Sequence, residues 1–187
     1  MRCFIAIPVP NYIKDYAQGI VKSVSEISPD VKWVENENYH LTLKFLGDID
    51  PGSVKKITER LQHIAKNIPP FQLKVNGAGF FPNAKRPRVV WLGVAGELEQ
   101  AMILGKKIDT SLLELNFAPE RKRSFHLTLG RIRSEDHLIK LLEKVREIDK
   151  EPGLSPFEVG EFKLMESILS PRGSRYKVLA SFSLTKS

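Results

Sequence analysis

The spacing of apolar residues divides this chain into strand-like and helix-like segments. Residues 2–8 form an apolar run that predicts a buried strand ending at Pro8. Apolar residues then recur at intervals of three and four through residues 11–27, which predicts an amphipathic helix. The same period predicts helices after Asp50 and over residues 98–115.

Two polar residues indicate where helices begin. Asp50 precedes Pro51, and this pair predicts an N-cap followed by a proline in the first helical turn. Ser134 is expected to cap a later helix. The core side of that helix is expected to carry Leu138, Leu141, Leu142 and Val145.

The remaining segments read as strands. They are residues 32–34, 71–81, 89–94, 157–169 and 176–184. Residues 89–94 are continuously apolar, which favours a central strand. Gly77 and Gly79 predict a bulge, and residues 171–173, Pro-Arg-Gly, predict the last turn. Because no linker interrupts this order, we predict one α+β domain over residues 1–187, with much antiparallel pairing.

One tetrapeptide, His-Leu-Thr-Leu, occurs twice, at residues 40–43 and 126–129. Each copy reads as a strand, in which side chains alternate between two faces. The leucines are expected to be buried, and the histidine and threonine of each copy to face a groove. The copies suggest a duplicated strand whose polar face is used in the same way twice.

Half of the four histidines belong to this repeat. A single histidine on a strand is usually a structural residue, but the repetition favours a chemical role for His40 and His126. Two imidazoles in one groove can take and give a proton, as acid-base phosphoryl chemistry requires. His63 and His137 lie in charged, helix-like surroundings and are expected at the surface.

Composition limits the class of protein. The 187 residues include one cysteine, Cys3, which excludes an intramolecular disulfide and disfavours a thiolate metal site. No apolar run approaches the ~18 residues of a membrane span, so we expect no membrane association and a cytoplasmic location. The net charge of +7 favours a polyanionic partner. Cations gather near the motifs and turns, at Lys85, Arg86, Arg88, Arg121, Lys122, Arg123, Arg131, Arg133, Arg172, Arg175 and Lys177. About half of them are expected to be ordinary solvated charges.

Several segments together resemble one family. They are residues 2–7 (RCFIAI), 40–47 (HLTLKFLG), 88–93 (RVVWLG), 126–131 (HLTLGR) and 170–173 (SPRG), followed by Tyr176. In this order they resemble the two-histidine phosphoesterase superfamily, and within it the RNA 2′,3′-cyclic phosphodiesterases, also called 2′-5′ RNA ligases. The resemblance implies a bilobal domain with pseudo-two-fold duplication, in which two antiparallel sheets face a central groove and helices lie outside.

The resemblance also implies an activity. RNA ends that carry a 2′,3′-cyclic phosphate would be hydrolysed to 2′-phosphates, with 2′-5′ ligation as the reverse reaction. The spacing alone cannot divide the roles of the two histidines, but the resemblance implies His40 as the acid and His126 as the base. The hydroxyls of Thr42 and Thr128, two residues further along each strand, could reach the phosphate oxygens.

Three more residues are candidate substrate contacts by resemblance. Arg131 matches an arginine that contacts the phosphate, although it could also be a surface charge at a strand end. Phe4 matches an aromatic residue on which the terminal base can stack, and simple core packing is the alternative. Tyr176 is a weaker candidate of the same kind.

No metal or cofactor is expected, since two histidines, two threonines and a cation complete the chemistry. The expected partner is RNA with cyclic phosphate ends, of which tRNA fragments are one example, and the protein is expected to be a monomer. Two other functions stay open at this point. One is hydrolysis of a small cyclic phosphate such as ADP-ribose 1″,2″-cyclic phosphate, and the other is a non-catalytic RNA-binding module.

Overall fold

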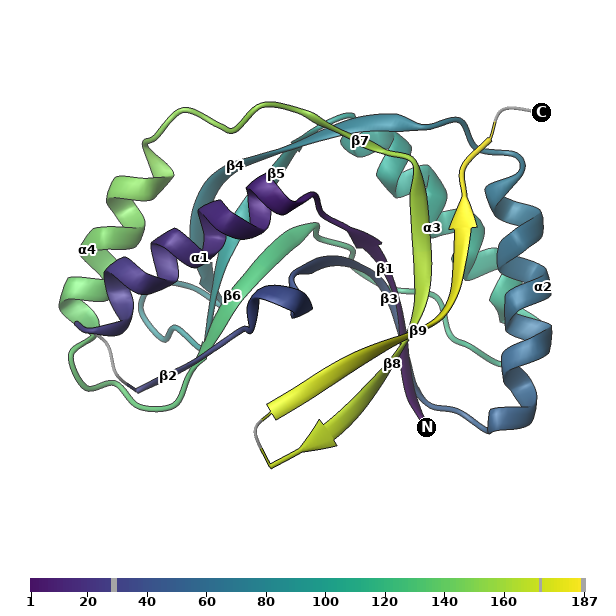
Figure 1. The fold of residues 1–187 in the computed structure, drawn as a ribbon, viewed down its shortest axis with the longest axis horizontal. Coiled ribbons are helices and arrows are strands. Elements are labelled where there is room, and N and C mark those ends of the chain that lie inside the picture. The colour runs from purple at the N-terminus through teal and green to yellow at the C-terminus, as the bar shows by residue number, and fades with distance from the viewer. Residues whose placement is uncertain (28–29, 172, 186–187) are drawn as a thin grey trace.

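The computed structural model describes residues 1–27, 30–171 and 173–185, and within them the strands form one curled sheet (Figure 1). The strands are β1 (Arg2–Pro8), β2 (Val31–Trp33), β3 (His40–Asp48), β4 (Phe71–Phe81), β5 (Val89–Gly96), β6 (His126–Ile132), β7 (Phe157–Val159), β8 (Glu161–Ser170) and β9 (Gly173–Ser183). Their order is β7-β4-β5-β6-β3-β1-β8-β9, with β2 beside β6, and each pairing is antiparallel. The predicted α+β class is confirmed.

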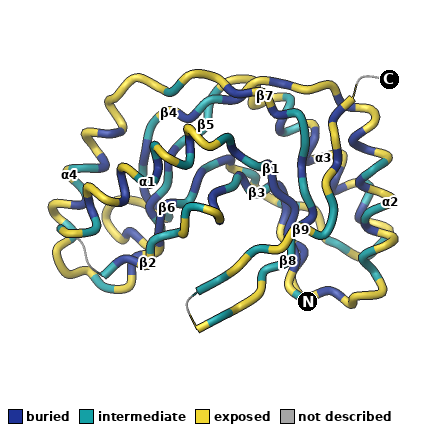
Figure 2. Tube along the Cα trace, viewed as in Figure 1, coloured by how far each residue is buried: buried dark blue, intermediate teal, exposed yellow. Residues whose placement is uncertain are grey.

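Helices cover the outer side of the curled sheet. They are α1 (Asn11–Ser25), α2 (Val54–Ala65), α3 (Leu98–Leu113) and α4 (Leu138–Asp149). In Figure 1, α1 and α4 lie beside β4, β5 and β6, whereas α2 and α3 lie at the opposite end, near β8 and β9. Each helix buries one face, as its apolar spacing predicts, and leaves the other exposed (Figure 2).

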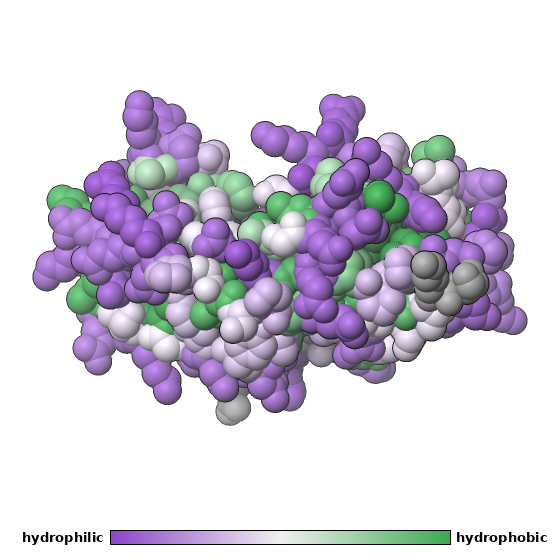
Figure 3. Space-filling view, turned by 90° about the horizontal axis from the view of Figure 1, so that it is seen from above, coloured by the Kyte–Doolittle hydropathy of each residue, from purple (hydrophilic) through white to green (hydrophobic). Residues whose placement is uncertain are grey.

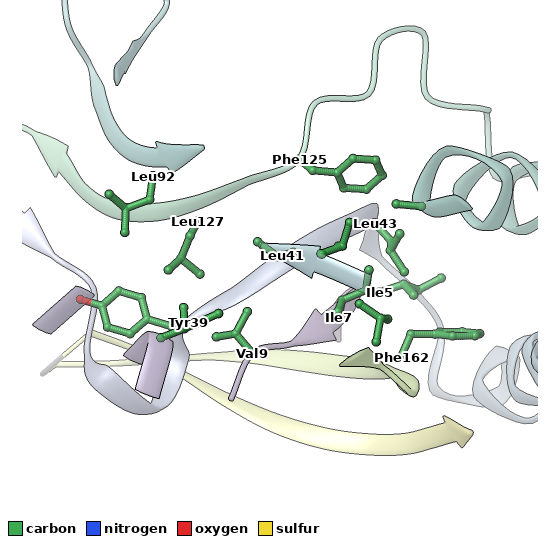
Figure 4. Packing of buried hydrophobic residues seen from close by; sticks show 14 of the residues in the cluster. Ile5, Ile7, Val9, Tyr39, Leu41, Leu43, Leu92, Phe125, Leu127 and Phe162 are labelled. Atoms are coloured by element: carbon green, nitrogen blue, oxygen red, sulfur yellow. The ribbon is translucent and has the colours of Figure 1, made fainter. Parts of the chain in front are cut away.

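The two motif strands join the halves of the molecule. We expected two facing sheets, but β3 and β6 connect the halves into one nine-stranded sheet through a single pair, Leu41 with Leu127. Both leucines are fully buried in the core that continues beneath both halves (Figure 4). The duplication itself stays a prediction.

One predicted helix cap is confirmed and the other is wrong. Asp50 is the N-cap of a short 3₁₀ turn, η2 (Pro51–Ser53), with Pro51 in its first turn, and η2 leads directly into α2. The backbone carbonyl of Asp50, not its side chain, accepts a bond from the Ser53 N–H. The hydroxyl of Ser134 instead bonds to Asp136 in a local turn, and α4 begins only after His137, whose backbone is left-handed.

The predicted strand over residues 157–169 is two strands. It divides at Gly160, so that β7 pairs with β4 at one end of the sheet and β8 pairs with β1 near the other. The predicted bulge lies in β4, where the register shifts between Val75 and Ala78 and Gly77 has a positive φ of 81°. Another 3₁₀ turn, η1 (Asn36–Asn38), fills the turn before β3. Arg172 of the last predicted turn lies outside the described residues.

Polar side chains cover most of the face in Figure 3, which views the molecule from the top of Figure 1, and apolar atoms form smaller patches between them. Within the described ranges, no helix has the length and apolar character needed to cross a membrane.

Candidate active site

The repeated tetrapeptide forms the starts of β3 and β6, at the centre of the sheet. Its leucines are buried, whereas the histidines and threonines are only half-buried on the other face. Since Leu41 pairs with Leu127 in an antiparallel register, Thr128 stands opposite His40, and His126 stands opposite Thr42. The histidine of each motif is therefore opposite the threonine of the other, on either side of the Leu41–Leu127 pair.

Both imidazoles are held by the same device. The Nδ1 of His40 bonds to the carbonyl oxygen of Asn38 at 2.7 Å, and the Nδ1 of His126 bonds to that of Ser124 at 3.1 Å. Each carbonyl lies two residues before its histidine. Because a carbonyl only accepts, Nδ1 carries the proton in each ring, and Nε2 is left to take or give one.

The Nε2 atoms have different neighbours. In His40, Nε2 lies 3.0 Å from the Thr42 hydroxyl, which donates to the neutral ring and accepts from the protonated one. The Nε2 of His126 makes no hydrogen bond with any part of the chain that the structure describes. The second imidazole is thus the one whose reactive nitrogen is open to an incoming molecule.

Burial lowers the pKa of both histidines, because it disfavours the charged ring. The backbone carbonyls oppose this change by favouring the protonated form. The charge of Arg131 lowers the pKa of His126 further, and the charge of His126 does the same to His40. Both rings therefore favour the neutral form more than free imidazole does.

A cavity of about 480 Å³ opens beside His40. Six of the seven residues predicted from the sequence line it, namely Phe4, His40, Thr42, Thr128, Arg131 and Tyr176. The seventh, His126, is not part of the cavity lining, although its charge lowers the pKa of His40. The cavity therefore lies on the His40 side of the two motifs.

Aromatic rings accompany each histidine. The Phe4 ring lies 4.8 Å from that of His40, and the Tyr176 ring meets both edge-on, at 4.9 and 5.3 Å. Phe4 is only 4% exposed, so it supports His40 from below and offers little of its face to the cavity. On the other strand, Phe81 meets His126 edge-on at 4.8 Å, and Trp91 lies 6.5 Å away. Sequence reasoning missed Phe81 and Trp91, which only the strand pairing brings to His126.

A bulge interrupts both motif strands at the same position. Against β1, the register passes from Thr42 to Lys44 and leaves Leu43 unpaired. Against β5, it passes from Thr128 to Gly130 and leaves Leu129 unpaired. An extra residue reverses the faces that follow it. This reversal brings Arg131 to the groove, where simple alternation would have placed it with the leucines.

A buried cluster of charges joins β3, α3 and the loop before β6. The Asp109 carboxylate of α3 accepts from Lys44 at 2.7 Å and from Arg123 at 3.0 Å. The Nε of Arg123 also donates to the Leu43 carbonyl at 3.1 Å. Burial raises the pKa of Asp109, but the hydrogen bonds and charges of these two cations outweigh it and leave the pKa below its ordinary value. Arg123, which we had grouped with cations available to a ligand, is thus a buried structural residue.

Other predicted cations are exposed as expected, including Arg131 on β6, Arg133 just after it, and Arg175 and Lys177 on β9. Among the residues that the structure describes, no group of three or more His, Cys, Asp and Glu side chains is placed to hold a metal ion.

Comparison with known proteins finds one family throughout. The family model described as "LigT like Phosphoesterase" matches residues 7–91 and 93–176, so each matched segment contains one of the two motifs. The chain is 33% identical over 184 residues to the RNA 2′,3′-cyclic phosphodiesterase of Methanothermobacter thermautotrophicus, covering 98% of this chain and 99% of that protein. It is 37% identical over 182 residues to the protein of the same name from Archaeoglobus fulgidus, covering 97% and 99%.

Solved structures give the same result. TT0787 of Thermus thermophilus matches with a TM-score of 0.79 and 25% identity, over 100% of this chain and 99% of that one. LigT of E. coli in complex with 3′-AMP matches with a TM-score of 0.75 and 26% identity, over 99% and 98%.

Proposed function

The chain belongs to the LigT-like phosphoesterase family, and from this premise we propose that it hydrolyses 2′,3′-cyclic phosphate ends of RNA to 2′-phosphates. The observation that carries the proposal is the arrangement of the two motifs. Each motif carries a histidine and a threonine on the same face of its strand, and each imidazole is fixed by a carbonyl two residues earlier. His40, Thr42 and Thr128 line the cavity, and His126 stands opposite Thr42 beside it. The match to a LigT in complex with 3′-AMP supports a ribonucleotide as the ligand.

In the proposed mechanism, water attacks phosphorus in line with the departing 3′ oxygen. The Nε2 of His126, which has no partner among the described residues, takes the water proton. Protonated His40 gives the proton on its Nε2 to the 3′ oxygen as the P–O3′ bond breaks. The phosphate stays on the 2′ oxygen, and each histidine ends in the protonation state with which the other began.

Charge that develops on the non-bridging oxygens needs donors. Thr42, Thr128 and Arg131 line the same cavity as His40 and are the residues we assign to this role. Arg131 also favours neutral His126 through its charge, as suits a base. If the 5′-hydroxyl of a second RNA replaces water, the same proton transfers yield a 2′-5′ linkage.

The direct test is to incubate the protein with an oligonucleotide that ends in a 2′,3′-cyclic phosphate and to identify the terminal phosphate. We expect a 2′-phosphate, formed in the presence of EDTA and without a nucleoside triphosphate. Recovery of unchanged substrate, or of a 3′-phosphate, contradicts the proposal. We expect the protein to act on RNA, as a monomer, in the cytoplasm.

A further inference from the structure

The guanidinium of Arg123 is buried and holds two different elements at once. Its side chain is 5% exposed, and one of its terminal nitrogens donates to the Asp109 carboxylate on α3 at 3.0 Å. Its Nε donates to the Leu43 carbonyl on β3 at 3.1 Å. A planar guanidinium makes both bonds in one fixed geometry, which the single ammonium of a lysine does not reproduce. Arg123 thus joins the loop before β6 to both α3 and β3.

The bond to Leu43 continues the contact between the two motif segments. β3 and β6 share one paired position, Leu41 with Leu127. If that antiparallel register continued, Leu43 would stand opposite Phe125, but the pairing of the two strands does not reach this position. The Arg123 side chain bonds to the Leu43 carbonyl there instead. A side chain therefore fixes the two motifs to each other where their backbone pairing has ended.

This link lies one residue from the carbonyl that holds His126. Ser124 follows Arg123 directly, and its carbonyl oxygen accepts the bond from the Nδ1 of His126 at 3.1 Å. The position of that carbonyl fixes the orientation of the ring and the direction of its Nε2. Since Arg123 is tied to Leu43 in the first motif, a shift of its guanidinium would change the position of His126 relative to His40.

A glycine on α3 leaves space for this guanidinium. A Cβ on Gly105 would lie 2.5 Å from the Nε of Arg123 and 2.6 Å from its Cζ. Glycine lowers the stability of a helix relative to alanine, and Gly105 is a buried position within α3. The helix therefore carries a less favourable residue at the place where the Arg123 side chain needs room.

We propose that Arg123 is a positioning residue for the base, and that its bond to the Leu43 carbonyl sets the resting position of His126 relative to His40. This inference rests on the proposed function and deepens it. In-line attack requires both imidazoles at a defined separation, and a displacement of about 1 Å can cost about 100-fold in rate. Because Arg123 acts through the Ser124 carbonyl and not on the substrate, its loss should lower kcat and leave KM nearly unchanged.

The first test moves the guanidinium without removing any charge. Gly105→Ala places a methyl group against Arg123, which must then shift away from the Leu43 carbonyl. Gly19→Ala on α1 is the matched control, because an added Cβ there meets nothing within 4 Å. On a 2′,3′-cyclic phosphate substrate, we expect Gly105→Ala to lower kcat about tenfold with little change in KM, and Gly19→Ala to keep wild-type kinetics. Wild-type kcat in Gly105→Ala overturns the inference.

A second pair of variants separates position from stability. Arg123→Met and Lys44→Met each leave Asp109 with one of its two cations, but only the first removes the bond to Leu43. The midpoint of thermal unfolding should fall in both variants, whereas kcat, measured where both are folded, should fall only in Arg123→Met. In His126→Ala, which already lacks the base, Arg123→Met should cause no further loss of the residual rate. Equal kcat losses in the two methionine variants, or a further loss in the double variant, would leave Arg123 a purely structural residue.

NMR tests the same displacement without any activity measurement. The chemical shifts of the His126 ring nitrogens report the bond between Nδ1 and the Ser124 carbonyl. They should change in Gly105→Ala and stay in place in Gly19→Ala. Unchanged shifts in Gly105→Ala contradict the inference even if its kcat is lower. If the shifts change but the wild-type protein hydrolyses no cyclic phosphate, the proposed function fails and the structural link from Arg123 to His126 stands.

Discussion

The two motif strands begin with the same four residues, and yet their surroundings differ. Both carry His-Leu-Thr-Leu, both bulge at the second leucine, and both tie Nδ1 to a carbonyl two residues earlier. His40, however, bonds to Thr42 and lines a cavity that Phe4 and Tyr176 help to form. His126 leaves its Nε2 without a bond to any described residue and lies near the charge of Arg131.

Under the proposed mechanism, this difference would allow one strand pattern to supply two chemical roles. The bond at Nδ1 leaves the Nε2 of either ring free for proton transfer. The repeated residues therefore do not decide which ring would act as the acid and which as the base. The neighbours that are not repeated then distinguish the rings. A nearby cation favours the neutral ring of a base, and a hydroxyl that can accept from Nε2–H suits an acid.

The largest effect should come from removing either imidazole. His40→Ala and His126→Ala should each lower hydrolysis more than ~100-fold, because each removes one partner of the acid-base pair. The double variant should be little slower than either single one, since the two act as a unit. Rate measurements on a cyclic phosphate substrate check this, and a single variant with near-normal activity would show that the pair does not act together.

A change of leaving group should separate the two roles. A substrate with a good aryl leaving group needs no proton from the acid. His40→Ala should therefore recover part of its activity on that substrate, and His126→Ala should not. The measurement is the ratio of rates on the two substrates for each variant. Recovery by His126→Ala would reverse the assignment, and recovery by neither would remove leaving-group protonation from the mechanism.

The buried charge cluster should matter to stability more than any surface pair. Asp109→Ala leaves Lys44 and Arg123 buried without their carboxylate, which costs about 3–5 kcal/mol in unfolding free energy. Glu114→Ala breaks an exposed pair with Arg60 and should cost less than about 1 kcal/mol. Urea unfolding of both variants tests the contrast, which equal losses would contradict.

The smallest effect concerns pH. Arg131 lowers the pKa of His126, so Arg131→Gln should raise that pKa, and the base will become protonated at a higher pH. The acidic limb of kcat/KM for the free enzyme should therefore move upward. Arg133→Gln, which removes an exposed cation two residues further along the chain, should leave the limb in place. Movement of the limb in both variants would mean a general effect of net charge.

Much of the fold followed from the chain alone. The apolar periods predicted the helices and most strands, and the repeated tetrapeptide predicted which side chains would face the groove. The pattern could not predict Arg123 as a buried residue, because its partner Asp109 lies 14 residues earlier on another element. Nor could it place Phe81 and Trp91 beside His126, since that contact depends on how β4, β5 and β6 pair. The sequence pattern also does not predict the bulges in β3 and β6. In each of these strands, one unpaired residue reverses the face of the sheet to which the following side chains point.

The single pair between β3 and β6 has a mechanical consequence. β1 and β3 are joined by seven pairs and β5 and β6 by five, so the junction of the two motif strands has the fewest paired residues among the described strands. We expect small rocking motions to concentrate there, with Leu41 and Leu127 as the pivot. The gap between the two imidazoles would then be adjustable, able to widen as a bulky nucleotide enters and to narrow around its phosphate.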